Sequence, residues 1–106
     1  MYKTILDSIV SALEELDSYI IKYGEQSAGL NTRMVLLLLK ECFEKEQPNE
    51  RVLRAFKDVC TTIAVTNETA SFAPSVFNIY DQLEEELPGF KKLDLLGMDF
   101  GQGDPV

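Results

Sequence analysis

A chain of 106 residues, of which 45% are hydrophobic, is long enough to form one domain with its own core, and this composition excludes a wholly disordered protein. The net charge of −8 argues against direct binding to nucleic acid or to an anionic membrane surface, because both require clusters of Lys and Arg. The longest uninterrupted apolar run, residues 34–39, is far shorter than the ~20 residues of a membrane-spanning helix, and no secretory signal is visible, so we expect a cytoplasmic protein.

The first predicted element is a helix from about Tyr2 to Tyr23. Gly24 is suited to end this helix, because glycine adopts positive φ without steric cost. The polar segment that follows, 25–30, contains Gly29 and is predicted to be a loop. The apolar residues of the helix recur at steps of three and four and form one stripe: Ile5, Ile9, Leu13, Leu16, Ile20 and Tyr23.

The second predicted helix begins after a cap at Asn31 or Thr32 and continues to about Glu46. Its centre, residues 34–39, is apolar on every side. A helix of this kind either lies at the centre of a bundle or faces another subunit. Formation of a homodimer through this helix is therefore one interaction that the sequence favours.

A third helix is predicted over residues 50–66, after Pro48 breaks the chain and Asn49 provides a cap. The β-branched stretch 61–66 resembles a strand, but the chain offers no partner strand, so we assign it to this helix. Cys42 and Cys60 are then separated by about 9 Å along the helix axes, which is too far for a disulfide. Both are predicted to be free, inert core thiols, in agreement with a reducing compartment.

A fourth helix is predicted from Pro74, which favours a first turn, to about Leu87, before the stop signal of residues 88–89. Four apolar residues after this stop indicate one more short helical turn: Phe90, Leu93, Leu95 and Leu96. The sequence therefore predicts an all-α protein. We expect an antiparallel bundle of about four helices with a short C-terminal helical turn in residues 1–96, and an acidic tail in 97–106.

The residues that usually carry catalysis are scarce. The chain contains no histidine, which removes the commonest general base and the usual zinc ligand. No glycine-rich phosphate-binding loop followed by Lys is present. We therefore expect neither an enzyme nor a cofactor or metal site.

Negative charge is concentrated at the end of the chain. Seven acids and two bases follow from Asp81 onward, so this segment accounts for five of the eight net negative charges. Glu84, Glu85 and Glu86 close a helix whose C-terminal end already carries partial negative charge. One interpretation is a solvated helix end that aids solubility; the other is a binding surface for a basic partner, extended one turn back by Asp81.

Aromatic residues accompany these acids. If Phe77 or Tyr80 is exposed beside Asp81 and Glu84, it can anchor a partner inside an acidic rim, with polar contacts from Asn78 on the neighbouring face. Phe100, next to Asp99 in the tail, is a second candidate anchor. The predicted partner-binding residues are Phe77, Asn78, Tyr80, Asp81, Glu84, Glu85, Glu86, Asp99 and Phe100.

The leading functional hypothesis is an inhibitor that binds a basic protein and masks its active site. In size, helicity and acidity the chain is similar to the small immunity proteins that neutralise bacterial nuclease toxins. The nuclease-colicin immunity proteins place an acidic helix and a Tyr-Tyr pair at their interface, whereas this chain offers a single tyrosine, Tyr80, inside a longer helix. The resemblance is one of composition. It implies a basic toxin or nuclease domain as partner.

Two other hypotheses fit the same sequence. In the first, the chain is a structural or adaptor bundle that associates through its second helix, and its acidity serves only solubility. In the second, the chain is an acidic mimic of nucleic acid that occupies the DNA or RNA groove of a defence complex. A charge reversal at Glu84 and Glu85 distinguishes the adaptor, which should tolerate it, from the other two.

Overall fold

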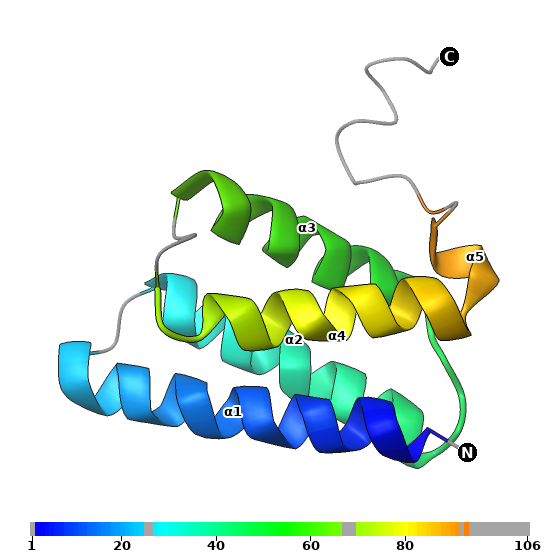
Figure 1. The fold of residues 1–106 in the computed structure, drawn as a ribbon, viewed down its shortest axis with the longest axis horizontal. Coiled ribbons are helices and arrows are strands. Elements are labelled where there is room, and N and C mark those ends of the chain that lie inside the picture. Colours follow the sequence, from blue (N-terminus) through cyan, green and yellow to red (C-terminus); the bar gives the residue numbers. More distant parts are fainter. Residues whose placement is uncertain (1, 25–26, 67–69, 92, 94–106) are drawn as a thin grey trace.

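The structure, a computed structural model, describes residues 2–24, 27–66, 70–91 and 93. These ranges contain four long helices and one short helix, and no strand is found in them: α1 (Lys3–Tyr23), α2 (Ser27–Glu44), α3 (Glu50–Thr66), α4 (Ala73–Glu86) and α5 (Pro88–Lys91). The predicted all-α helical bundle is confirmed (Figure 1). The predicted tail, 97–106, lies outside the described residues.

The four long helices form a closed ring in which each runs antiparallel to the next (Figure 1). α1 packs against both α2 and α4, while α3 packs against the other sides of the same two helices. α5 packs on α4. This order places α2 and α4 at opposite corners of the bundle, so their outer surfaces face in different directions.

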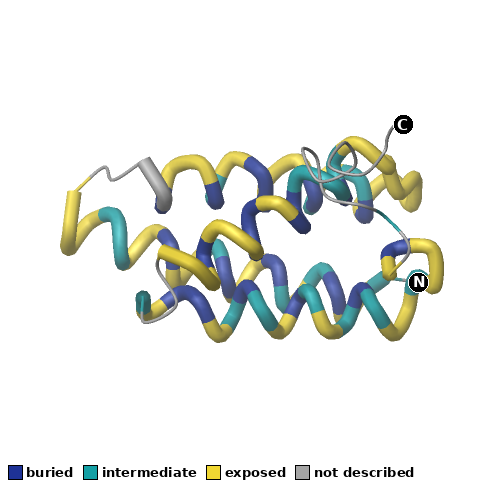
Figure 2. Tube along the Cα trace, turned by 90° about the horizontal axis from the view of Figure 1, so that it is seen from above, coloured by how far each residue is buried: buried dark blue, intermediate teal, exposed yellow. Residues whose placement is uncertain are grey.

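One stripe of each helix supplies the core, and the buried positions lie on the sides turned toward the bundle centre (Figure 2). Burial of such apolar surface contributes about 25 cal/mol per Å² and is the main source of stability in a bundle of this kind. The largest fully buried side chains are Phe43, Phe56, Phe72, Phe90, Ile5, Ile9, Leu16, Leu36, Leu39, Ile63, Ile79 and Leu83.

The predicted end of the first helix is confirmed. Gly24 has φ 86°, a conformation that glycine adopts readily, and its N–H donates a hydrogen bond of 2.8 Å to the carbonyl of Ile20. This bond satisfies one of the carbonyls that the helix end leaves without an intrahelical partner.

The predicted start of the second helix was wrong. α2 begins at Ser27, inside the segment expected to be a loop, and it ends at Glu44. Gly29 is buried in the first turns of α2, where a Cβ would lie 3.3 Å from Cγ1 of Ile20 in α1. The close packing of two helices at this glycine outweighs its low helix propensity. Thr32, proposed as a cap, is instead buried inside the helix.

The apolar centre of α2 does not make it a central helix. Val35, Leu36 and Leu39 are buried, as the core face of a corner helix requires. The opposite face carries Met34 and Leu37, which are 56% and 42% exposed. The first of the two predicted alternatives, a helix surrounded by the bundle, is therefore wrong.

The third helix matches its prediction. Oδ1 of Asn49 accepts hydrogen bonds of 2.8 and 3.2 Å from the N–H groups of Arg51 and Val52, so this residue caps α3. The β-branched end of the segment is helical to Thr66, whose hydroxyl donates to the carbonyl of Thr62. Side-chain bonding of this kind accommodates threonine near a helix end.

α4 begins at Ala73 with Pro74 in its first turn, and Leu87 follows its last residue, as predicted. A short helical turn follows it as predicted, but this turn, α5, starts at Pro88 and includes Gly89, so these two residues do not stop the helical chain as expected. Of the four apolar residues assigned to the turn, Leu95 and Leu96 lie outside the described residues. Phe90 in α5 is buried against Phe56 of α3 and Tyr80 of α4. None of the described helices is sufficiently long and apolar to cross a membrane.

Candidate functional site

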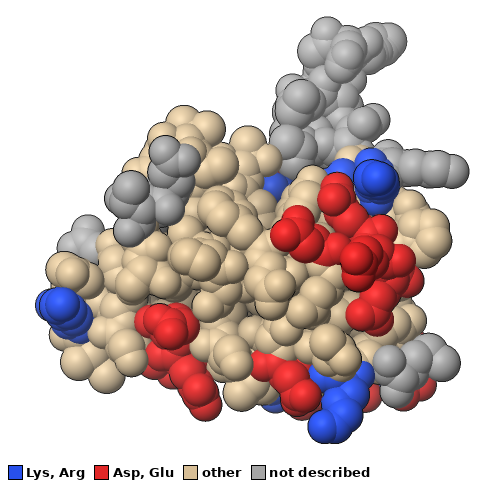
Figure 3. Space-filling view, in the orientation of Figure 1, with Lys and Arg blue, Asp and Glu red and all other residues tan. Residues whose placement is uncertain are grey.

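Acidic side chains gather over the C-terminal end of α4 (Figure 3). Asp81 and Glu85 are exposed and lie four residues apart, so they share the outer face of the helix. Glu84 is half-buried and Glu86 is exposed. Because each residue turns a helix by about 100°, the three consecutive glutamates point in different directions. The four acids Asp81, Glu84, Glu85 and Glu86 are called the acidic surface below.

Glu84 is tied to Tyr80, one turn earlier in α4. The two side chains share a hydrogen bond, in which the Tyr80 hydroxyl is the donor. Burial and the negative charge of Glu84 raise the pKa of Tyr80 above its ordinary value, so the hydroxyl remains a donor at neutral pH. The Tyr80 ring is held against Phe90, with ring centroids 5.2 Å apart. The aromatic residue is thereby fixed in place beside a carboxylate.

Phe77 and Tyr80 line a groove between α3 and α4. Both side chains are half-buried, not freely exposed, and pack against the edge of the core. The groove has a volume of about 220 Å³, and its lining is Cys60, Thr61, Ala64, Phe77 and Tyr80. It is called the α3–α4 groove below. Two of the predicted anchor residues therefore share one depression, next to the acidic surface.

The inner side of this groove is uncharged at neutral pH. Cys60 is a free, buried thiol, and burial together with the charge of Asp81 raises its pKa to about 12. A thiol of this kind stays protonated and is a poor nucleophile. The hydroxyl of Thr61 donates to the carbonyl of Lys57, so it is already engaged within its own helix.

Asn78 lies on the other side of α4. It lines a separate depression between α4 and α1, together with Asp7, Ser8, Ser11 and Ser75. Nearby, Nε2 of Gln82 donates a hydrogen bond of 2.8 Å to the Ser8 hydroxyl and ties the two helices. The structure thus separates Asn78 from Phe77 and Tyr80, with which the sequence grouped it.

The two remaining predicted residues, Asp99 and Phe100, lie outside the described residues. Sequence reasoning also missed the α3 side of the groove, formed by Cys60, Thr61 and Ala64. These residues are small, and two of them are spaced by four, which places them on one helix face. Such spacing indicates a surface onto which larger side chains can pack, but it does not identify α4 as the helix that supplies them.

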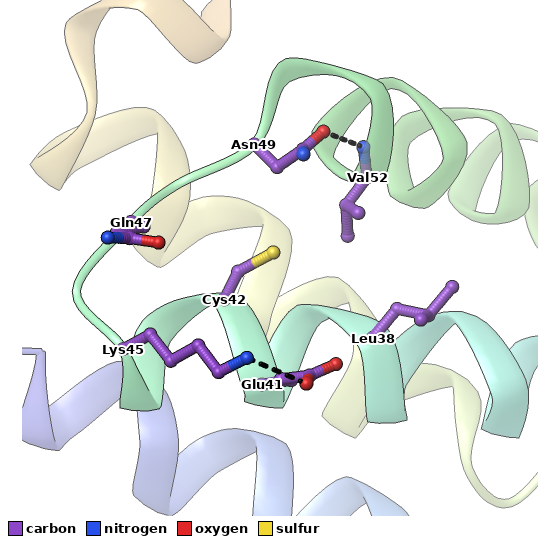
Figure 4. Close-up of a pocket in the computed structure, with 7 residues that line it drawn as sticks. All are labelled: Leu38, Glu41, Cys42, Lys45, Gln47, Asn49 and Val52. Carbon is purple, nitrogen blue, oxygen red and sulfur yellow. Dashed lines mark hydrogen bonds and ion pairs between the residues drawn. The ribbon is translucent and has the colours of Figure 1, made fainter.

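Cys42 occupies a different depression, between the end of α2 and the start of α3 (Figure 4). The cavity has a volume of about 300 Å³ and is also lined by Leu38, Glu41, Lys45, Gln47, Asn49 and Val52. Cys42 is free and half-exposed, so the prediction of two unpaired cysteines is confirmed, whereas the prediction that both are core residues was wrong for Cys42. The charged pair Lys45–Glu41 at this rim is 3.1 Å apart and exposed.

The chemistry available at these sites is that of recognition. In the part of the chain that the structure describes, no three His, Cys, Asp or Glu side chains form a group that could hold a metal ion. The α3–α4 groove offers aromatic and aliphatic surface, and the acidic surface beside it offers carboxylates. In comparisons with known proteins, no family model, no curated protein and no solved structure matches this chain.

Proposed function

We propose that this chain is a small acidic inhibitor that binds a basic, nuclease-type toxin and masks its active site. The observation that carries the proposal is the acidic surface of α4, with Asp81 and Glu85 on its outer face, adjoining the α3–α4 groove. A nuclease needs a positive cleft to hold its substrate, and an acidic surface competes for that cleft. Opposite charges also accelerate association, which suits an inhibitor that must act before a toxin does.

The combination of charge and apolar contact supports an interface more than a merely solvating helix end. Binding energy at protein interfaces comes mainly from a few residues, often Trp, Tyr or Arg, that lose contact with water in the complex and are surrounded by weaker contacts. Phe77 and Tyr80 are half-buried at the edge of the core, and Glu84 lies directly beside Tyr80. We place the action of the inhibitor in the cytoplasm, where the free thiols of Cys42 and Cys60 would stay reduced.

The proposal is tested by affinity capture from the lysate of the source organism at low and high salt. A captured basic protein should cleave RNA or DNA when alone and lose this activity when the wild-type chain is added. The double variant Glu84→Lys/Glu85→Lys should neither capture this protein nor inhibit its cleavage, while it stays folded with the helical content of the wild type. Capture that is indifferent to this charge reversal contradicts the inhibitor. If the captured protein requires the acidic surface for capture but binds DNA without cleaving it, the result favours the nucleic-acid mimic.

A second candidate function, an adaptor that associates with itself, is favoured by the outer face of α2. Four large apolar side chains are at least 42% exposed there: Leu30, Met34, Leu37 and Leu38. The ion pairs Arg33–Asp17, Lys40–Glu44 and Lys45–Glu41 leave the flanks of this face nearly neutral. Two copies of an acidic protein would repel each other least across such a face, since α4 lies at the opposite corner.

The adaptor is tested by sedimentation equilibrium from about 1 µM to about 1 mM, a range that covers weak and moderate dimers. A homodimer that Leu37→Glu abolishes and Leu37→Ala only weakens would support it. A chain that remains monomeric over the whole range contradicts it. Because Leu37 is 42% exposed, neither substitution creates a large cavity.

A further inference from the structure

We propose that the α3–α4 groove binds the side chain of an arginine from the partner protein, with its alkyl part against Phe77 and Tyr80 and its guanidinium group directed to Glu84. This inference rests on the proposed function and deepens it, since it states which basic side chain the acidic inhibitor recognises and where. We infer an arginine side chain from three properties: the size of the groove, the position of the carboxylates around it, and the aromatic and small residues that line it.

The size of the groove suits a single side chain. Its volume of about 220 Å³ is below the roughly 300–1,000 Å³ of pockets that bind small molecules. Its lining combines two aromatic rings from α4 with small residues from α3: Cys60, Thr61 and Ala64. The small residues keep the depression open, and the rings provide flat apolar surface for an alkyl chain.

The carboxylates around the groove indicate that the bound side chain is positively charged. Asp81 follows Phe77 by four residues, and Glu84 follows Tyr80 by four, so the two carboxylates lie one helical turn beyond the two rings. The apolar part of the groove therefore continues into a negatively charged end. A long side chain with an alkyl stem and a cationic head matches this order.

Lys57, one turn before Thr61, does not compete for this end of the groove. Its ammonium group donates a hydrogen bond of 2.7 Å to the carbonyl of Leu93 and lies 5.0 Å from the centre of the Phe90 ring. It is thus held toward α5. The free thiol of Cys60 adds no negative charge to the inner wall, so the carboxylates of Asp81 and Glu84 determine the local potential.

Arginine fits this arrangement better than lysine. Its guanidinium group is planar, more weakly hydrated than an ammonium group, and stacks on aromatic rings. It also offers several N–H donors at once, so it can bind Glu84 while that carboxylate keeps its hydrogen bond from Tyr80. Lysine offers a compact, strongly hydrated charge that would lose more solvation in a half-buried groove.

The test is an NMR titration of the full chain with two peptides, acetyl-Gly-Arg-Gly-amide and acetyl-Gly-Lys-Gly-amide. The arginine peptide should cause saturable shifts at Thr61, Ala64, Phe77 and Tyr80, with a dissociation constant in the millimolar range. Glu84→Gln keeps an oxygen that can accept from Tyr80 but removes the charge, and should weaken binding about three- to tenfold. The matched control Glu85→Gln, on the outer face of α4, should change binding less than about twofold.

Three outcomes overturn the groove site: shifts spread evenly over all acidic residues, equal binding of the two peptides, or no saturable shift at about 50 mM peptide, well beyond a millimolar dissociation constant. The groove site and the proposed function fail separately. If the Glu84→Lys/Glu85→Lys variant fails to capture the nuclease while the arginine peptide causes no shifts in the groove, the inhibitor hypothesis is supported and the groove site is wrong. If the peptide saturates the groove but capture is indifferent to the charge reversal, the inhibitor is wrong and the arginine site stands alone.

Discussion

The ammonium nitrogen of Lys57 lies 2.7 Å from the carbonyl oxygen of Leu93, a residue 36 positions further along the chain. A second, longer contact of 3.4 Å joins it to the carbonyl of Lys91. Lys57 is only 7% exposed, and its charge also lies over the Phe90 ring. This lysine therefore fastens α5 to α3, and α5 in turn supports Tyr80 through the Phe90 ring.

Replacing this lysine should loosen α5 selectively. Lys57→Met keeps the alkyl packing and removes the charge-assisted hydrogen bonds, while relief of the buried charge offsets part of the loss. We expect a decrease of about 1 kcal/mol in the free energy of unfolding and faster hydrogen exchange at the amides of Phe90 and Leu93. Lys45→Met, at an exposed ion pair, is the control. Unchanged exchange in α5 would show that Lys57 does not fasten it.

The two cysteines should differ in reactivity. The raised pKa of Cys60, about 12, keeps its thiol protonated at pH 8, and the side chain is also buried. Cys42 is half-exposed at the rim of its cavity. Mass spectrometry after brief treatment with iodoacetamide at pH 8 should find Cys42 modified much faster than Cys60. In the Cys42→Ser variant almost no rapid modification should remain; rapid alkylation of Cys60 in the folded variant would contradict its burial.

Stability should fall at alkaline pH. The pKa of Cys60 rises from 9.0 to about 12 on folding, so the folded state holds this proton more tightly than the unfolded state. The contribution of the protonated Cys60 thiol to the free energy of unfolding is fully present below pH 9. It is lost as the pH rises from 9 toward 12, by at most about 1.4 kcal/mol per pH unit. The raised pKa of Tyr80 acts in the same direction. Urea unfolding between pH 8 and 11 should show a shallower decline for Cys60→Ala than for Cys42→Ala.

A side chain at Gly29 should test the close approach of α1 and α2. A Cβ at this position would lie 3.3 Å from Cγ1 of Ile20, so Gly29→Ala gains helix propensity but crowds its neighbour, and the two effects should nearly cancel. The larger Gly29→Val should lower the free energy of unfolding by about 1–3 kcal/mol. Gly89→Val is the matched control, because no atom lies within 4 Å of a Cβ built there. Equal effects of the two valines, measured by urea unfolding, would refute the crowding.

Charge reversal at the end of α4 should stabilise the fold. Glu85 is exposed near the helix C-terminus, where the partial negative charge of the backbone disfavours an acid. Glu85→Lys should therefore raise the free energy of unfolding by about 0.5 kcal/mol. Glu14→Lys, in the middle of α1, makes the same change in net charge away from a helix end and should stabilise less. If both variants melt alike, the effect belongs to net charge alone.

Stability and the proposed binding should then respond in opposite ways. The acids that disfavour the end of α4 are the same residues that the inhibitor would present to a basic partner. The Glu85→Lys variant should thus melt at a higher temperature than the wild type. Combined with Glu84→Lys, the same substitution should contribute to the loss of partner binding. Such an opposition is common where a surface is selected for binding, since binding sites often break the local rules of stability.

Much of this molecule is predictable from local sequence. The spacing of apolar residues predicts the helices and, in α1, the buried positions Ile5, Ile9 and Leu16, because side chains three or four apart share a helix face. It does not identify the buried face of α2, whose centre is apolar on every side, and Tyr23 at the end of the α1 stripe is exposed. Asn49 and Gly24 mark helix ends through their own backbone and side-chain chemistry. The concentration of acids from Asp81 onward predicts, without any knowledge of the fold, that a binding partner would be positively charged.

Only the tertiary structure decided which residues meet across helices. Gly29 is part of a helix because α1 packs closely against it. This interaction cannot be predicted from the helix propensities of the neighbouring residues. Phe77 and Tyr80 join Cys60, Thr61 and Ala64 in one groove because α3 and α4 lie side by side, while Asn78, one residue from Phe77, faces α1. Local sequence determines the face on which a side chain lies; the packing of helices distant in sequence determines what that face meets.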